Sequence, residues 1–240
     1  VAVFFALFKA GAVPVLIDPG IGVKPLKACL SEAAPKAFIG VTKAHFARKF
    51  LGWAKESCEL LVSAGPKFGM GGVTLKKIRE MGEADSSEVL HDVDPNDMAA
   101  ILFTSGSTGA PKGVVYRHRH FNAQVQMLKK AFDIQPGEVS LPTFPPFALF
   151  DPALGMTTVV PIMDPTRPAD ANPEKLIAAM NRFKVTNVFG SPALLDTLSR
   201  HCVDKRIRIE SVTRVISAGA AVPIRTIRRM QQSLYQDAEI

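Results

Sequence analysis

Residues 98–116 read "MAAILFTSGSTGAPKGVVY" and combine an apolar run with a glycine-rich segment. The continuous apolar run at 98–103 is typical of a strand that is buried on both faces of a parallel sheet. It leads directly into the segment 104–113, which combines three glycines with hydroxyl side chains, a proline and a lysine. A second strand is expected at 113–116. The glycine-rich loop between two strands predicts an anion-binding site built from backbone N–H groups.

The residues before this stretch are predicted to form a partial α/β subdomain, 1–97. An apolar helix at 1–10 precedes a strand at 12–17, and an amphipathic helix joins that strand to another at 36–41. Strand, helix and strand at this spacing predict a βαβ unit with a parallel sheet. Residues 64–97 have a weaker apolar pattern and are expected to form a linker or an irregular surface excursion.

The residues from 98 to 240 are predicted to form a second, also partial, α/β subdomain that carries the loop. A helix is expected from about 121 to 132. Asn172–Pro173 and Ser191–Pro192 each place a capping side chain before a proline in the first helical turn. The whole chain is therefore assigned to the α/β class, with stacked, mostly parallel sheets, flanking helices and a site along one sheet edge.

The composition excludes several classes of function. The 240 residues carry a net charge of +7, but the basic residues are scattered and are not interleaved with aromatics as in a nucleic-acid surface. The three cysteines have neither metal-ligand spacing nor a disulfide pattern, so a cytoplasmic location and no metal-ligating residues are expected. No apolar run reaches the roughly 18 residues that a membrane span needs.

Several kinds of loop could explain the segment 104–113. Gly, Ser, Thr and Pro also dominate ordinary turns, but a turn needs neither so many donors nor Lys112. A kinase-type P-loop requires G-x-x-x-x-G-K-(S/T), and here Pro111 and Gly113 occupy two of its fixed positions. A dinucleotide fingerprint also fails because no G-x-G-x-x-G is present.

All ten positions fit (S/T)-S-G-(S/T)-T-G-x-P-K-G, and the stretch resembles the phosphate loop of the adenylate-forming (AMP-binding) superfamily. This family includes acyl-CoA synthetases, nonribosomal adenylation domains and luciferases. The resemblance extends to "FFALFKAGAVPVLIDP" (4–19), "GVVYRHRHF" (113–121), "NVFGSPALLDTL" (187–198) and "SAGAAVP" (217–223). It implies that the chain is part of the large N-terminal domain of such an enzyme, with ATP and Mg²⁺ as cofactors.

The resemblance also implies the site residues. Lys112 is expected to be catalytic. The residues expected to bind the nucleotide are Thr104, Ser105, Gly106, Ser107, Thr108, Gly109, Lys112 and Gly113 at the phosphates, and Gly219, Ala220 and Ala221 against adenine. The residues expected to contact the acyl substrate are His118, Phe147, Phe150, Gly190 and Pro192.

Two departures from the family pattern matter. The later family motifs and the mobile C-terminal domain with its catalytic lysine do not lie in these residues, so the chain is expected to be an internal fragment that is inactive alone. In addition, Phe147–Ala148 stands where acyl-CoA synthetases usually have an aromatic–His pair. Together with "VVYRHRHF" and "MDPTRPA" (163–169), this resembles the β-lactone synthetases of bacterial long-chain olefin biosynthesis.

This resemblance implies ATP-dependent activation of a carboxylate through an acyl-adenylate, followed by closure of a 2-alkyl-3-hydroxyalkanoate to a β-lactone. A long-chain fatty acyl-CoA ligase and a non-catalytic nucleotide-binding module stay open as alternatives. The expected partner is a long-chain hydroxy or fatty acid. Partner enzymes of a hydrocarbon pathway and a homodimer are both compatible with the resemblance.

Two polar residues, His118 and Asp151, have two interpretations each. His118 and His120 flank Arg119, and both histidines could be surface polar groups; only His118 also matches a family position. Asp151 could orient a substrate hydroxyl or cap a turn. The apolar residues around Phe147 could line a pocket or belong to the core.

Overall fold

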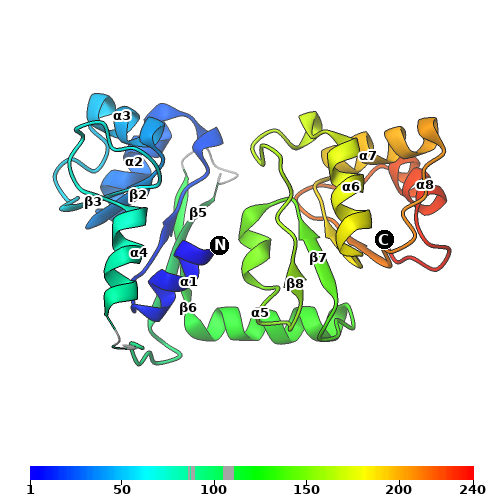
Figure 1. Cartoon of the computed structure of the whole chain (residues 1–240), viewed down its shortest axis with the longest axis horizontal. Helices are drawn as coiled ribbons and strands as arrows, with labels where there is room; N and C mark the ends of the chain where they lie inside the picture. Colours follow the sequence, from blue (N-terminus) through cyan, green and yellow to red (C-terminus); the bar gives the residue numbers. More distant parts are fainter. Residues whose placement is uncertain (86, 88–89, 105–110) are drawn as a thin grey trace. The chain divides into compact units, whose positions relative to one another are not determined.

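The computed structural model describes residues 1–85, 87, 90–104 and 111–240. The described chain falls into two compact units, one of residues 2–121 and one of residues 122–240 together with Val1. Each unit is an α/β structure with parallel strands, as the sequence predicts (Figure 1).

The first unit contains two three-stranded sheets. Its strands are β1 (Val15–Leu16), β2 (Ala37–Gly40), β3 (Leu60–Ser63), β4 (Val73–Thr74), β5 (Met98–Thr104) and β6 (Lys112–Arg117). Its helices are α1 (Ala2–Lys9), η1 (Pro19–Ile21), α2 (Val23–Ala33), α3 (Thr42–Leu51) and α4 (Leu75–Ala84), and α5 (His118–Ala131) begins at its end. One sheet has the order β1-β5-β6, with β1 parallel and β6 antiparallel to β5. The other has the order β2-β3-β4 and is parallel throughout.

The predicted βαβ unit is wrong in one respect, because β1 and β2 lie in different sheets. The partner of β1 is β5, a seven-residue strand whose Ala99 and Ala100 are fully buried. A two-residue strand such as β1 offers few backbone groups for pairing, and these pair with the long buried strand rather than with β2. The pairing is nevertheless parallel, as predicted.

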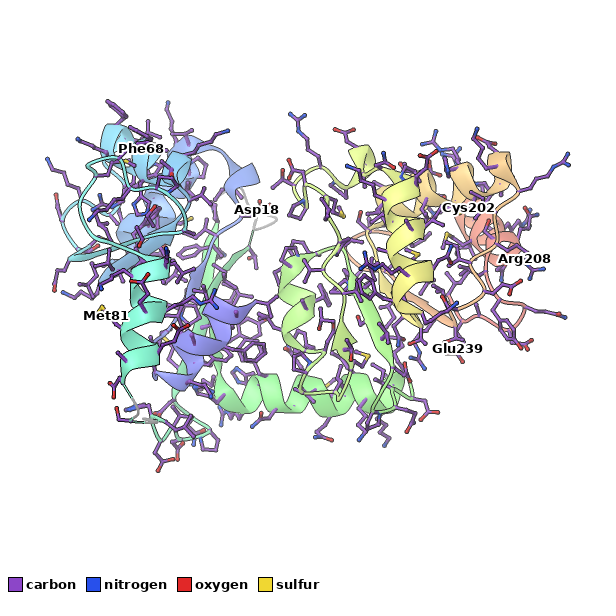
Figure 2. The ribbon with its side chains drawn as sticks, viewed as in Figure 1. Asp18, Phe68, Met81, Cys202, Arg208 and Glu239 are labelled. Atoms are coloured by element: carbon purple, nitrogen blue, oxygen red, sulfur yellow. The ribbon has the colours of Figure 1, made fainter. Side chains whose placement is uncertain are left out.

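The predicted linker at 64–97 contains helix α4, which the weak apolar pattern of these residues did not predict. Thr74 caps this helix, since its hydroxyl accepts a hydrogen bond from the Lys77 N–H at 3.2 Å. No residue of α4 is buried, and Met81 on it is labelled in Figure 2. An exposed helix needs no continuous apolar stripe, so the pattern that usually reveals a helix is weak here.

The first subdomain was expected to end near residue 97, whereas the structure groups residues 98–121 with the first unit. The physical reason is the pairing of β5 with β1, which ties the loop-bearing hairpin to the N-terminal strands.

The second unit contains one parallel sheet of order β10-β9-β7-β8. Its strands are β7 (Val139–Pro142), β8 (Thr157–Thr158), β9 (Asn187–Phe189) and β10 (Arg214–Ile216). Its helices are η2 (Pro145–Leu149), η3 (Pro168–Asp170), α6 (Pro173–Phe183), α7 (Pro192–Lys205) and α8 (Ile224–Ser233). The predicted caps are confirmed: Asn172 accepts from the Lys175 N–H at 3.2 Å, and Ser191 accepts from the Leu194 N–H at 3.4 Å.

The two faces of this sheet are covered differently. Successive strand residues point to opposite faces, so Leu141 and Val188 lie on the face that is packed by α6, α7 and α8 in the main hydrophobic core (Figure 1). Cys202, labelled in Figure 2, lies in the same core, and burial raises the pKa of its thiol to about 11. Ser140 and Asn187 point to the other face, which the segment 145–156 and the second half of α5 cover. In the described part of the chain, no helix is long and apolar enough to cross a membrane.

Candidate functional site

The hairpin of β5 and β6 frames the predicted phosphate loop. Thr104, the last residue of β5, is directly opposite Lys112, the first residue of β6. Antiparallel pairing therefore holds the two ends of the loop side by side. Five predicted phosphate-binding residues lie outside the described residues, and these are Ser105, Gly106, Ser107, Thr108 and Gly109.

Gly113 lies at a close approach across the hairpin. It is paired with Phe103, and a Cβ atom added to Gly113 would lie 3.1 Å from Cζ of Phe103 and 3.4 Å from Cγ2 of Ile101. The absence of a side chain at 113 thus lets the ring of Phe103 pack over the strand. This packing helps to fix β6 and with it the backbone of Lys112.

Lys112 is exposed, and its ammonium group forms no ion pair with any acidic side chain in the described ranges. The Lys112 ammonium group and the Thr104 hydroxyl are donors of the kind that phosphate oxygens accept. Their role in binding a triphosphate stays a prediction. The described residues contain no group of three or more His, Cys, Asp or Glu that could hold a metal ion.

The basic cluster after β6 anchors the start of α5. The N–H groups of His118 and Arg119 donate to the carbonyl oxygens of Asp97 and Pro95, at 3.2 and 2.8 Å. The Nδ1 atom of His120 accepts a hydrogen bond from the Arg117 N–H at 3.1 Å. These contacts hold the first turn of α5 in place, so much of the basic cluster has a structural role at the start of this helix.

His118 has a further contact, because its half-buried ring packs edge-on against Phe8 of α1 with the ring centroids 5.6 Å apart. This contact joins the helix start to the N-terminal helix. Its predicted role beside the substrate stays a prediction.

The predicted adenine-binding segment lies at the carboxyl edge of the second unit's sheet. Gly219, Ala220 and Ala221 follow β10 and are all exposed, and Gly219 has a positive φ of 94°. Gly190 follows the neighbouring strand β9, and its N–H donates to the Ile216 carbonyl at 3.1 Å. Parallel strands end at the same edge, which is where ligands of α/β sheets usually bind.

Phe147 and Phe150 line a cavity of about 50 Å³ in the second unit, beside the sheet. The ring of Phe147 stacks on that of Phe189, with the centroids 3.7 Å apart. The other lining residues are mostly apolar: Leu128, Ile134, Pro142, Leu154, Met156, Val188 and Ile216. Gly190 and Pro192 come next along the chain from Phe189 but do not line this cavity, so the structure brings together only two of the four predicted pocket residues of this unit.

A cluster of polar side chains lies in the wall of the same cavity. Asp151 is 4 % exposed, and its Oδ2 atom accepts a hydrogen bond from the Thr158 hydroxyl at 3.0 Å. Ser140 is also 4 % exposed and is the residue opposite Thr158 in the pairing of β7 with β8. Burial raises the pKa of Asp151, and hydrogen bonds from Thr158 and Ser140 oppose this shift.

Asp151 lies in the turn that follows η2 and lines the cavity. Its carbonyl oxygen accepts from the N–H groups of Leu154 and Met156, at 3.1 and 2.9 Å, so the backbone closes this turn. Phe147, Phe150, Asp151 and Leu154 follow the helical spacing i, i+3, i+4, i+7, which places them on one face. The sequence left two interpretations of Asp151 open, a contact with a substrate hydroxyl and the cap of a turn.

An ion pair lies at the amino ends of the strands in the sheet of the second unit, opposite to the edge where Gly190 and Gly219 follow their strands. Arg214 donates to Glu138 at 2.7 Å, and Asn187 also donates to Glu138. Burial alone would raise the pKa of Glu138, but the hydrogen bonds from Asn187, from the Gln135 N–H and from Arg214, together with the charge of Arg214, hold it below its usual value. This network lies at the amino ends of the strands, opposite to Gly190 and Gly219, and its Asn187 also lines the cavity.

The chain matches the model of the AMP-binding enzyme family over residues 1–240, and it therefore belongs to that family. It is 55% identical over 235 residues to an olefin beta-lactone synthetase of Xanthomonas campestris pv. campestris, which covers 98% of this chain and 41% of that protein. A protein of the same description from Stenotrophomonas maltophilia is also 55% identical, with 98% and 42% covered. The chain thus spans about two fifths of the length of these relatives.

The fold is shared with the apo structure of Mycobacterium smegmatis MbtA, with a TM-score of 0.80 at 20% identity over 96% of this chain and 42% of the other. This similarity confirms the predicted α/β architecture. The family membership confirms the resemblance on which the site residues were assigned, and the individual site assignments stay predictions.

Replacing Asp151 by asparagine is expected to change how the free energy of unfolding depends on pH. Because burial raises the pKa of Asp151 above 3.8, the folded protein holds this proton more tightly than the unfolded chain does. The contribution of Asp151 is therefore fully present below about pH 4 and is lost as the pH rises through the raised pKa. The Asp151→Asn variant should lose less stability than the parent protein between about pH 4 and pH 7, measured by urea unfolding.

Asp164→Asn serves as the control, because the carboxylate of Asp164 is exposed and hydrogen bonds from the side chain and N–H of Thr166 lower its pKa. Its contribution is present above 3.8 and is lost as the pH falls, so removing it should change the profile in the opposite direction. Identical pH profiles for the parent protein and Asp151→Asn would contradict the burial of an ionisable carboxyl at 151.

Proposed function

We propose that this chain is part of an ATP-dependent enzyme that activates a carboxylic acid as an acyl-adenylate and then closes it to a β-lactone. The substrate is a 2-alkyl-3-hydroxyalkanoate with long alkyl chains. The observation that carries this proposal is the 55% identity, over nearly the whole chain, to two olefin beta-lactone synthetases. The phosphate-loop residues of the hairpin, quoted above, support the first step independently.

In the first step, a carboxylate oxygen of the acid attacks the α-phosphorus of ATP, and the bond to the β-phosphate breaks, which releases pyrophosphate. Two anions approach each other, so the barrier is largely electrostatic. Lys112, the hydroxyl of Thr104 and the N–H groups of the loop lower this barrier by holding the β- and γ-phosphates in place and by balancing the charge on the leaving group. Mg²⁺ would arrive with the triphosphate and would supply further positive charge at its oxygens.

In the second step, the 3-hydroxyl oxygen attacks the acyl carbonyl carbon, and the bond between that carbon and the AMP oxygen breaks. The hydroxyl proton passes to water, and the products are a four-membered lactone and AMP. Because the attacking group belongs to the substrate itself, no thiol is needed. Phe147 and Phe150 give the cavity wall apolar rings, which suit an acyl chain better than a polar gate does.

We also propose that the protein acts in the cytoplasm, with partner enzymes of a hydrocarbon pathway and as a homodimer. Cys29, Cys58 and Cys202 are all free thiols, which fits a reducing compartment.

The products distinguish this function from its alternatives. The full-length protein is incubated with ATP, Mg²⁺ and a long-chain 2-alkyl-3-hydroxy acid, with and without coenzyme A, and the products are identified by mass spectrometry. We expect a β-lactone in both reactions. A thioester that forms only with coenzyme A would identify an acyl-CoA ligase, and the absence of pyrophosphate release would identify a non-catalytic module.

Removing the charge at Lys112 tests the role of the hairpin. Lys112→Ala in the full-length protein should reduce the rate of pyrophosphate release by about 10²-fold or more, because a cation aligned with the leaving group is lost. Lys130→Ala is the matched control, since this lysine lies in the last turn of α5 and has no predicted role at the site. Near-normal pyrophosphate release by Lys112→Ala would contradict the assignment.

A further inference from the structure

The cavity lined by Phe147 and Phe150 has one carboxyl group in its wall, that of Asp151. No other acidic residue is found among the described residues that line this cavity. The residues nearest to Asp151 in sequence on the same wall are the rings of Phe147 and Phe150 and the side chain of Leu154. A buried carboxyl in such surroundings is costly unless hydrogen bonds compensate it. The position therefore calls for a reason other than packing.

The two hydroxyl groups around Asp151 satisfy only part of its capacity. Thr158 donates to Oδ2 at 3.0 Å, and Ser140 is its other hydrogen-bonding side chain. An ionised carboxyl group offers about four acceptor sites, so acceptor capacity is left over. In the described ranges no lysine, arginine or histidine forms an ion pair with Asp151.

The carboxyl group is not needed to close the turn in which it sits. The N–H groups of Leu154 and Met156 bond to the carbonyl oxygen of Asp151, not to its side chain. An alanine could make the same backbone bonds. The side chain instead points toward the sheet face that carries Ser140, Thr158 and the cavity.

We propose that Asp151 is a specificity-determining residue whose carboxyl group accepts a hydrogen bond from the hydroxyl group of the substrate acid. This proposal rests on the proposed function and adds to it the residue that distinguishes a hydroxy acid from a plain fatty acid. A cavity of about 50 Å³ has room for a few water-sized groups, and thus for the hydroxyl-bearing part of an acyl chain. A plain alkyl chain placed there would desolvate the carboxyl group without giving it a donor, and such unpaired polar groups reject the wrong ligand strongly.

The test compares two acids of equal chain length, a 2-alkyl-3-hydroxyalkanoate and the same acid without the 3-hydroxyl. The ratio of kcat/KM for pyrophosphate release with the two acids is measured in the full-length protein. The parent protein should favour the hydroxy acid. Asp151→Ala should reduce this ratio by about 10- to 100-fold, because one charge-assisted hydrogen bond is lost.

Two further variants make the result decisive. Asp151→Asn keeps the shape but replaces one acceptor oxygen by a donor, so the ratio should fall in this variant even if the alanine variant does not fold. Asp164→Asn removes an exposed carboxylate, and its ratio should equal that of the parent protein. Urea unfolding of each variant shows whether it is folded.

Each outcome has a distinct meaning. If the folded Asp151 variants slow both acids equally and keep the parent ratio, Asp151 has only a structural role and this proposal is overturned while the proposed function stands. If the parent protein releases no pyrophosphate with either acid, the proposed function fails and this proposal fails with it.

Discussion

The antiparallel pairing of β5 with β6 is the constraint on which the candidate nucleotide site depends. It sets Thr104 opposite Lys112 and so fixes where the intervening loop begins and ends. The hairpin is held in turn by the parallel pairing of β5 with β1 and by the complete burial of Ala99 and Ala100. Donors that are held in place before a ligand arrives need little reorganisation during the reaction, and this is the main way in which a protein lowers a barrier between two anions.

In the second unit, alternate residues of each strand point to the two opposite faces of the sheet. One face packs into the main hydrophobic core, in which Leu141 and Val188 pack among leucines of α6 and α7. The opposite face presents Ser140 and Asn187 to a cavity that a short turn-rich segment covers. Because neighbouring residues of one strand serve the two faces, the helices fix the sheet and the sheet fixes the positions of the polar groups.

Several helices and strands could be predicted from the sequence because local signals carry them, whereas α3, β3, β4 and β8 were not predicted. The caps at Asn172 and Ser191 and the apolar run of β5 needed no knowledge of distant residues. The partner of β1 could not be inferred, because strand pairing depends on which distant strand offers the better buried edge. The exposed helix α4 was missed since it lacks an apolar stripe.

The candidate site, too, has residues that the sequence predicts and contacts that it does not. Phe147 and Phe150 were predicted to contact the acyl substrate; both line the cavity, and their contact with a substrate stays a prediction. The hydrogen-bond partners of Asp151 could not be predicted, because Ser140 and Thr158 lie on two strands whose register the sequence does not reveal. Stacking of Phe189 on Phe147 likewise joins residues that are far apart in the chain.

The most direct measurement is a crystal structure of the full-length protein with a non-hydrolysable ATP analogue and Mg²⁺. The account requires the β- and γ-phosphate oxygens to lie within about 3 Å of the Lys112 Nζ atom and of the Thr104 hydroxyl. A triphosphate bound at another place, with the Lys112 side chain left in solvent, would contradict the account.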